Sequence, residues 1–315
     1  MRRSLFPIVV LILLWSRAAA AQPTVFTDVK VRFNRSEKDR RLVDKVAVLV
    51  FDSAARRLVV NSPESPERSL NIPYDTIQNI HFEITTHMRG GVLAELIGAA
   101  AAVSVGVPEA GVPLSSKKVN DYWCYIEYLD SSSRIRNQML EIGKNSSDRV
   151  FETMVQTFGD RVKKVEFAEQ AEPIEKSSIA DLQSKHQIKV DKKNHPLPAM
   201  ESGKALIVVV CPPLAARNSG KGAQFKIHAN DRAVIVNKSG TYSFAYLDPG
   251  DYRLVSQSEN ASGFRITLEA GQEYYFLQNT LSGTFKQRTS LSRNSKELVL
   301  YELSGAYYSD WKRKK

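Results

Sequence analysis

The sequence predicts a mainly β protein with two β-rich domains joined by a polar segment. Three observations lead to this fold class. Short apolar runs that alternate with polar residues recur along the chain, turn residues separate them, and only one run repeats at helical spacing. The length of 315 residues suits about two domains. Hydrophobic residues make up 43% and charged residues 25%, a composition that can build a globular core.

The chain begins with the pattern of a secretory signal peptide. Arg2 and Arg3 precede an apolar run over residues 5–15, and small residues follow up to Ala21. The run is shorter than the roughly 20 apolar residues of a membrane-spanning helix. We therefore expect residues 1–21 to be a cleaved signal peptide. Since no cysteine lies near the cleavage position, we expect a periplasmic or secreted protein without a lipid anchor.

Strand signals dominate residues 22–165, the first predicted domain. Residues 45–51 are almost continuously apolar, and a polar turn leads to a second run at residues 58–60, which predicts a hairpin. Residues 63–67 contain two prolines and predict a loop. Further strands are expected at residues 70–72, 77–84, 122–129 and 135–142, with a turn at residues 130–133 between the last two.

One amphipathic helix is expected at the end of this domain. Asn145, Ser146 and Ser147 offer oxygens that could cap its first turn. Apolar residues then recur at helical spacing and would lay one face of the helix against a sheet. These residues are Val150, Phe151, Met154, Val155, Phe158, Val162 and Val165.

Several strands closed by one helix resemble the pleckstrin-homology-like architecture, including its bacterial relatives and the GRAM type. The segments SLNIPYDTIQNIHFEI and DRVFETMVQTF carry the resemblance. It implies a β-barrel or sheet with a C-terminal helix. In lipid-binding members, the loop between the first two strands grips phosphoinositide headgroups. Acidic residues dilute the charge of the corresponding cluster here, so we expect a solvated loop; the cluster comprises Arg32, Arg35, Lys38, Arg40, Arg41 and Lys45.

An apolar insertion interrupts the first domain at residues 88–113. Its apolar part, residues 92–107, is too short to span a bilayer. Two interpretations stay open: a hairpin that dips into a membrane or docks on a partner, or a long loop that folds back on its own domain. In the first case, the candidate contact residues are Val92, Leu93, Leu96, Ile97, Val103 and Val105.

Residues 166–203 predict a linker, and residues 204–308 predict a β-sandwich. The linker is rich in Glu, Gln, Lys and Ser, and a short helix is expected near residues 179–186. Beyond it, short strands separated by turns at regular spacing are typical of a sandwich. The expected strands cover residues 205–211, 225–228, 233–236, 241–247, 252–255, 264–268, 273–278, 285–291 and 298–303.

Three segments of this second domain resemble the bacterial domain of unknown function 2846 family: KALIVVVCPP, GTYSFAYLDPGDYRLV and LEAGQEYYFLQ. The LDPGDY turn is also similar to that of transthyretin-like and carboxypeptidase-regulatory sandwiches. Pro249 presets φ there, and Gly250 permits a positive φ. The resemblance implies an immunoglobulin- or transthyretin-like sandwich in an exported protein. It implies no activity, because the family has none established.

No arrangement of residues predicts catalysis. The sequence has no Gly-x-Ser-x-Gly elbow or phosphate loop, and its five histidines form no ligand pair at helical spacing. Asp75 and Glu83 are not distinguished from ordinary strand-end carboxylates. Cys124 and Cys211 lie in strand-like runs, which favours buried free thiols over an interdomain disulfide. We expect no catalytic residue, no cofactor-binding residue, no metal site and no cofactor.

The charge of the chain adds a further candidate contact. The net charge is +10, and a predicted basic tail covers residues 309–315. The tail could meet an anionic surface or simply be solvated. Nucleic acid is not an expected partner, since no reader motif is present. The candidate anion contacts are Lys312, Arg313, Lys314 and Lys315.

Together these features predict an exported, non-catalytic binding or adaptor protein of the bacterial envelope. Its partner would be an unknown envelope protein or a membrane surface. Two alternatives stay open. One is a peripheral membrane protein that uses residues 92–107 and the basic tail together. The other is a hydrolase with an unrecognised site.

Overall fold

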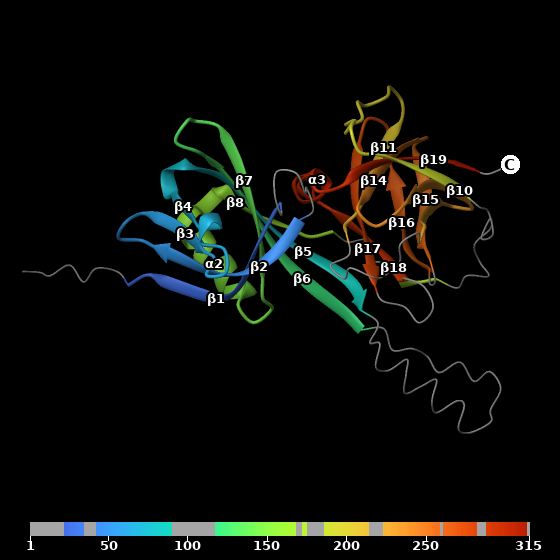
Figure 1. The fold of residues 1–315 in the computed structure, drawn as a ribbon. Coiled ribbons are helices and arrows are strands. Elements are labelled where there is room, and N and C mark those ends of the chain that lie inside the picture. The colour runs from blue at the N-terminus through green and yellow to red at the C-terminus, as the bar shows by residue number, and fades with distance from the viewer. Residues whose placement is uncertain are drawn as a thin grey trace, which may run out of the picture.

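The structure is a computed structural model, and it is mainly β, as predicted. Its described strands form three sheets and no closed barrel. Figure 1 shows two lobes side by side, the first domain in blue and green and the second in yellow to red. The described residues are 22–34, 42–89, 117–167, 172–174, 186–213, 223–258, 261–281 and 288–313.

The first domain is an eight-stranded sheet with one helix against it. The strand order is β4-β3-β2-β1-β7-β6-β5-β8. One face of the sheet packs on helix α2 (Ser147–Phe158), which buries Val150, Met154 and Phe158 in the core of this domain. The strands are β1 (Thr24–Asn34), β2 (Leu42–Asp52), β3 (Arg57–Asn61), β4 (Leu70–Pro73), β5 (Ile77–Arg89), β6 (Lys117–Leu129), β7 (Ile135–Ile142) and β8 (Val162–Val165).

Both predicted hairpins of this domain are confirmed, as β2–β3 and β6–β7. The predicted helix is confirmed at its start, but its predicted extent to residue 165 is wrong. Gly159 has a φ of 57°, a left-handed conformation that ends a helix, and its N–H donates to Val155 O. Val162 and Val165 therefore lie in β8, which pairs in parallel with β5. Ser146 is the N-cap residue, but its side chain makes no capping hydrogen bond.

The second domain is a sandwich of two sheets, as predicted. The sheet orders are β10-β19-β14-β11-β17-β18 and β13-β12-β15-β16-β9. Their inner faces share one core that includes Ile207, Ile235 and Phe276. The strands are β9 (Glu172–Pro173), β10 (His186–Asp191), β11 (Ala205–Cys211), β12 (Phe225–Ala229), β13 (Arg232–Asn237), β14 (Thr241–Leu247), β15 (Gly250–Gln257), β16 (Ala261–Leu268), β17 (Glu273–Leu281), β18 (Arg288–Asn294) and β19 (Tyr307–Arg313).

The prediction of a strand at residues 298–303 is wrong, because this segment lies in helix α3 (Lys296–Ser304). Ser295 is its N-cap, and the Ser295 hydroxyl accepts a hydrogen bond from Leu298 N–H. The segment LVLYEL is almost continuously apolar, and such a run does not distinguish a strand from a helix buried on several sides.

Three strands that lie wholly or mainly outside the predicted sandwich take part in its sheets. Within the predicted linker, β9 pairs with β16 and β10 pairs with β19. Residues 179–185 of the short predicted helix lie outside the described residues, and His186 begins β10. Residues 309–313 of the predicted basic tail belong to β19 and so form part of a sheet. No helix among the described ranges is long and apolar enough to cross a bilayer.

Candidate functional site

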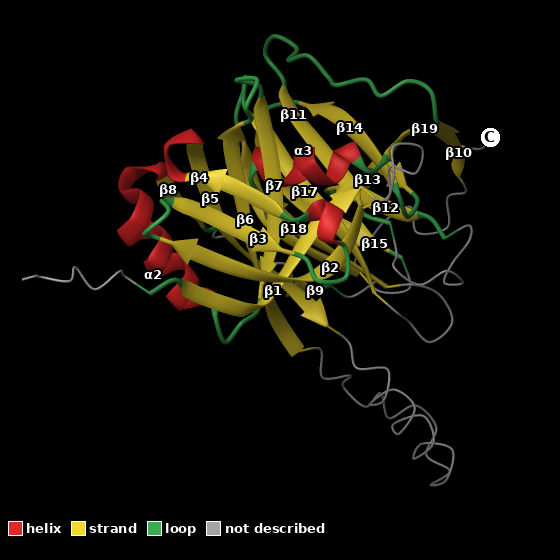
Figure 2. Ribbon diagram, turned by 60° about the vertical axis from the view of Figure 1, so that its left-hand side comes forward, coloured by secondary structure: helices red, strands yellow, loops and turns green. Residues whose placement is uncertain are grey.

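Helix α3 lies between the two domains and joins them through one apolar cluster, which we call the junction. The first domain contributes Trp123 and Met139 from strands β6 and β7. The sandwich contributes the outer face of its six-stranded sheet, including Val208 of β11. Helix α3 fills the space between them with Leu298 and Leu303, both almost fully buried. In Figure 2 the strands of both domains flank this helix.

A carboxylate of the first domain holds the N-terminal end of α3. Glu83 of β5 is only 2% exposed. Its Oε2 accepts a hydrogen bond from the Ser295 hydroxyl at 2.5 Å, and its Oε1 accepts from Ser295 N–H at 3.2 Å. Asn294 Nδ2 donates to Glu83 Oε1 at 2.8 Å and to Thr85 Oγ1 at 2.9 Å. A negative group at this position also interacts favourably with the positive end of the helix dipole.

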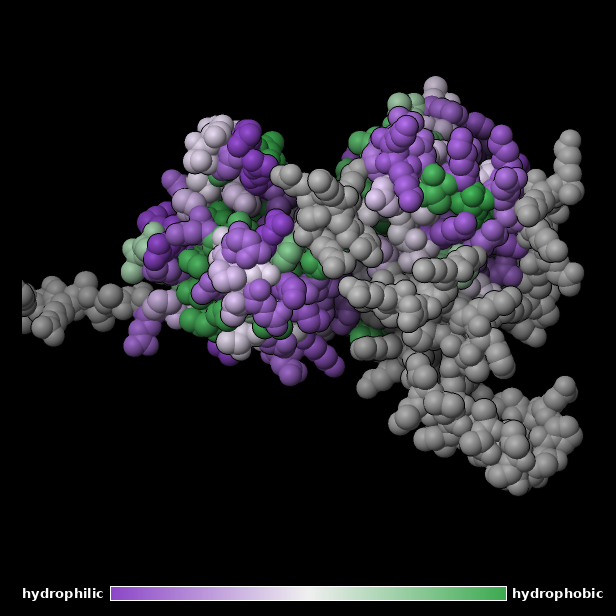
Figure 3. Space-filling view, viewed as in Figure 1, coloured by the Kyte–Doolittle hydropathy of each residue, from purple (hydrophilic) through white to green (hydrophobic). Residues whose placement is uncertain are grey.

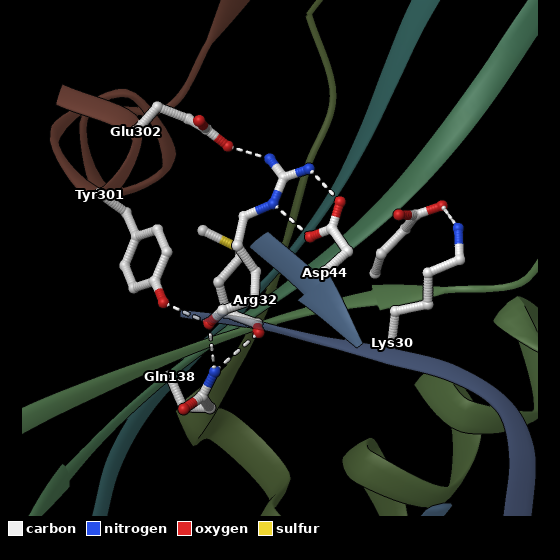
Figure 4. A network of polar contacts seen from close by, with 8 residues as sticks. Lys30, Arg32, Asp44, Gln138, Tyr301 and Glu302 are labelled. Atoms are coloured by element: carbon white, nitrogen blue, oxygen red, sulfur yellow. Dashed lines mark hydrogen bonds and ion pairs between the residues drawn. The ribbon is translucent and has the colours of Figure 1, made fainter. Parts of the chain in front are cut away.

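An arginine of the first domain holds the other end of α3 (Figure 4). Arg32 Nη1 donates to Glu302, while Arg32 Nε and Nη2 donate to the two carboxylate oxygens of Asp44 at 2.6 and 2.8 Å. The Arg32 carbonyl oxygen accepts from the Tyr301 hydroxyl at 2.5 Å and from Gln138 Nε2 at 2.8 Å. Both the side chain and the backbone of Arg32 therefore contribute to the junction.

The environment of Arg32 corrects its assignment to a solvated basic loop. Arg32 belongs to β1, its side chain is 17% exposed, and its guanidinium lies 4.4 Å from the centre of the Trp123 ring. The cluster residues 35–41 lie outside the described ranges, and Lys45 lies in β2. Burial raises the pKa of Glu302, although Arg32 opposes that shift. Burial also raises the pKa of Glu83, against the hydrogen bonds from Ser295 and Asn294.

Beside the junction lies a pocket of about 360 Å³, in which Lys296 pairs with Glu273 and Arg293 lies over aromatic rings. Lys296 Nζ lies 2.5 Å from Glu273 Oε2, and the Tyr275 hydroxyl donates to the same oxygen at 3.0 Å. Arg293 stacks over the rings of Phe167 and Tyr274, each with a centre 5.1 Å away. These interactions stabilise the wall of the pocket and leave it little capacity to recognise a ligand.

Two further pockets of about 490 Å³ lie around the turns at Asn230 and Asp248 of the sandwich. One opens between the two sheets and is lined by residues of both. The other lies over strands β15 and β16, where Arg253 and Arg265 face each other across the ladder. On the face of the molecule in Figure 3, hydrophobic residues of the described surface form small patches separated by hydrophilic ones.

Both cysteines are structural residues, and one histidine lies close to the junction. Cys124 and Cys211 are free and buried, which confirms the favoured interpretation, and burial raises the pKa of both thiols. His81 Nδ1 lies 3.8 Å from Glu297 Oε2 of α3, at the edge of the junction. In the described ranges, no three His, Cys, Asp or Glu side chains are grouped closely enough to hold a metal ion.

Of the residues proposed as partner or anion contacts, only Lys312 and Arg313 lie in the described ranges. Lys312 is exposed in β19, Arg313 ends that strand, and Lys314 and Lys315 lie outside the described residues. The six apolar residues of the insertion also lie outside them: Val92, Leu93, Leu96, Ile97, Val103 and Val105.

Sequence reasoning named Arg32 and Glu83 but missed their role at the junction, although two of the junction residues carried a signal. Glu83 interrupts the apolar run IHFEI, and Glu302 interrupts LVLYEL. A carboxylate within an apolar strand or helix is seldom buried without a partner. That rule indicates a buried pair at each position, but it does not identify the partner, which comes from the other domain.

Comparisons with known proteins assign no family. No protein-family model matches the chain, and no curated protein matches it. Among solved structures, one similar chain is a "putative cell adhesion protein" from Bacteroides fragilis NCTC 9343. The two are 8% identical with a TM-score of 0.16, over 86% of this chain and 85% of that one. A likeness at this level assigns neither fold nor function. The resemblances to pleckstrin-homology-like domains and to the 2846 family stay predictions.

Proposed function

We propose that this chain is an exported, non-catalytic binding or adaptor protein of the bacterial envelope. The observation that carries the proposal is the junction, in which one helix of the second domain is buried against both sheets and held at each end by the first domain. Domains move relative to each other by default unless their interface is large and hydrophobic. A fixed pair of β-rich domains suits a protein that presents loops to a partner.

Two further features support this role. The predicted signal peptide at residues 1–21 would direct the chain to the periplasm or the medium. In the pocket beside the junction, Glu273 is paired with Lys296 and Arg293 lies over two aromatic rings, which favours a structural role for these side chains. The partner would be an unknown envelope protein, a membrane surface being the alternative that liposome flotation tests, and no cofactor is proposed.

The test combines location with contact in living cells. A photoreactive phenylalanine analogue is placed at Asp231, in the exposed β12–β13 turn of the sandwich, or at Ala54, in an exposed turn of the first domain. We expect mature protein that begins near residue 22, in the periplasm or medium, and discrete crosslinked products from at least one position. Full-length protein in the cytoplasm, or no crosslinked product from either position, would contradict the proposal.

Liposome flotation separates this function from a peripheral membrane role. The mature protein is compared with a variant that lacks residues 92–107. We expect both proteins to stay in the soluble fraction. Flotation of the mature protein that the deletion abolishes would instead assign the insertion to a membrane-binding function.

A further inference from the structure

We propose that the sandwich binds a small ligand with an apolar aromatic or acyl group and one anionic group, in a pocket between strands β14 and β19. The inference rests on the proposed binding function and gives it a site and a ligand class. The pocket measures about 490 Å³, within the usual range for small-molecule sites.

The pocket exists because two neighbouring strands separate. Strand β19 pairs with β14 only at Thr241–Tyr307 and Tyr242–Tyr308. At Ser309 the strand contacts both sheets: its carbonyl oxygen accepts from the Ser243 hydroxyl of β14 at 2.7 Å, and its hydroxyl donates to Val236 O of the other sheet at 3.2 Å. Beyond Ser243, β14 no longer pairs with β19, and Trp311 of β19 lines one side of the resulting opening.

The floor of the pocket is lined by small residues. The inner faces of a sandwich normally fill the space between the sheets with interlocking side chains. Here Ala229 and Ala233 come from one sheet and Ala245 from the other, so the space between the sheets stays open. Val234 and Leu247 complete an apolar lining that continues into the core of the sandwich. An apolar group of a ligand would be buried there.

The rim of the pocket determines the expected charge of the ligand. Lys204 is neutralised by Asp248, whose carboxylate lies 2.7 Å from the lysine Nζ. The Tyr252 hydroxyl donates to Asp248 O, and the Tyr246 hydroxyl donates to Ala199 O. Arg232 lines the same pocket, is exposed, and makes no ion pair with any described residue. An arginine in this position favours an oxyanion.

The other candidate pocket is less suited to this role. It lies over Arg253 and Arg265, but Arg253 already has Asp231 at 3.7 Å, and the Asp251 carboxylate lines the same pocket. It therefore offers less unbalanced positive charge, and Ile266 is the one aliphatic residue among its lining residues. Arg265 nevertheless provides a matched control, because it is an exposed arginine on the same domain.

The experiment uses two dyes of similar shape that differ in charge. The first is 8-anilinonaphthalene-1-sulfonate, and the second is its neutral relative N-phenyl-1-naphthylamine. Binding is followed by the indole N–H signals of Trp311 and Trp123 in 1H–15N spectra of the mature protein. Trp123 lies in the junction and serves as an internal control. We expect either dye to shift the Trp311 signal and leave the Trp123 signal in place.

Three variants test the contribution of the pocket. Ala245→Phe fills the floor and should abolish the Trp311 shift while thermal stability is retained. Arg232→Gln should weaken sulfonate binding about tenfold, as expected for one charge-assisted hydrogen bond, and leave the neutral dye unaffected. Arg265→Gln should change neither dye. No shift at Trp311, a shift only at Trp123, or equal effects of Arg232→Gln on both dyes would overturn the inference. Such a failure leaves the export and crosslinking results unaffected, so it is separable from failure of the proposed function.

Discussion

Glu83 of the first domain caps a helix of the second domain: its carboxylate accepts hydrogen bonds from both the hydroxyl and the backbone N–H of Ser295, the N-cap residue of α3. The two residues are 212 positions apart in the sequence. At the other end of the same helix, Arg32 binds Glu302. The helix is therefore fixed to the first domain at both ends, while its own chain connects it to the sandwich.

The Glu83 carboxyl should make stability depend on pH. Burial raises its pKa above the ordinary value of 4.5, so the folded protein binds this proton more tightly than the unfolded chain does. The resulting stabilisation is fully present below pH 4.5 and is lost as the pH rises through the folded-state pKa. Glu83→Gln removes this titration. We expect the free energy of unfolding of the wild type, minus that of Glu83→Gln, to fall as the pH rises from 4 to 8.

This comparison is made by urea unfolding across that pH range. If the free energy of unfolding of the wild type, minus that of Glu83→Gln, instead increased with pH, the effect of the hydrogen bonds from Ser295 and Asn294 on the Glu83 pKa would outweigh that of burial. Glu127→Gln is a suitable control, because Glu127 is a half-buried carboxylate on the neighbouring strand β6.

Removal of one partner of the buried ion pair should destabilise the protein strongly. Glu302 is 1% exposed and Arg32 is 17% exposed. Arg32→Ala leaves the Glu302 carboxylate buried without its cation, which should cost about 3–5 kcal/mol. Replacement of both residues, Arg32→Met with Glu302→Leu, should recover most of that loss. A double-mutant cycle of Arg32→Met, Glu302→Leu and the double variant, followed by urea unfolding, measures the coupling. Additive costs would show that the two groups are energetically independent.

The two cysteines should stay reduced and unreactive in the folded protein. Both are fully buried, and the raised pKa of each thiol keeps it protonated at neutral pH. A thiol reagent should therefore react with Cys124 and Cys211 only at the rate of unfolding. Mass spectrometry of the mature protein should find two free thiols. A disulfide, or rapid labelling under native conditions, would contradict this arrangement.

The C-terminal residues should divide into a structural strand and a dispensable end. Truncation after Gly305 removes β19, the partner of β10 along its whole length. We expect this variant to melt at least several degrees lower, because both a strand pair and the burial of Ala306 are lost. Truncation after Arg313 should leave the melting temperature unchanged. Equal melting temperatures for all three proteins would mean that β19 adds nothing to the sandwich.

The parts of this fold that sequence predicted well are those specified locally. Alternation and turn residues identified the β6–β7 hairpin and the turn at Asp248 and Pro249, since both depend on neighbouring residues. The left-handed Gly159 ended α2 earlier than the apolar periodicity indicated. The local pattern also predicted a strand where residues 298–303 form a helix. An almost continuously apolar run shows neither the alternation of a strand nor the 3.6-residue period of a helix.

The junction could not be predicted from sequence, because its geometry depends on contacts between distant segments. In the sequence, Arg32 is not distinguishable from the other charged residues of a polar loop. Only the structure shows its contacts with Asp44, Glu302 and Trp123. Glu83 could be recognised as unusual within an apolar strand, but its partner is a residue of the other domain. A short polar segment such as β10 is likewise a strand only because β19 is available to pair with it.

The most direct test of a fixed two-domain body is the distance between the domains in solution. Spin labels are attached at Ser132→Cys, in the exposed turn after β6, and at Ala270→Cys, in an exposed turn of the sandwich. The native thiols are buried and should not be labelled. Pulsed electron–electron double resonance should give one narrow distance distribution, which broadens when Arg32→Ala and Glu83→Ala are combined. A broad distribution in the otherwise unaltered protein would contradict the account.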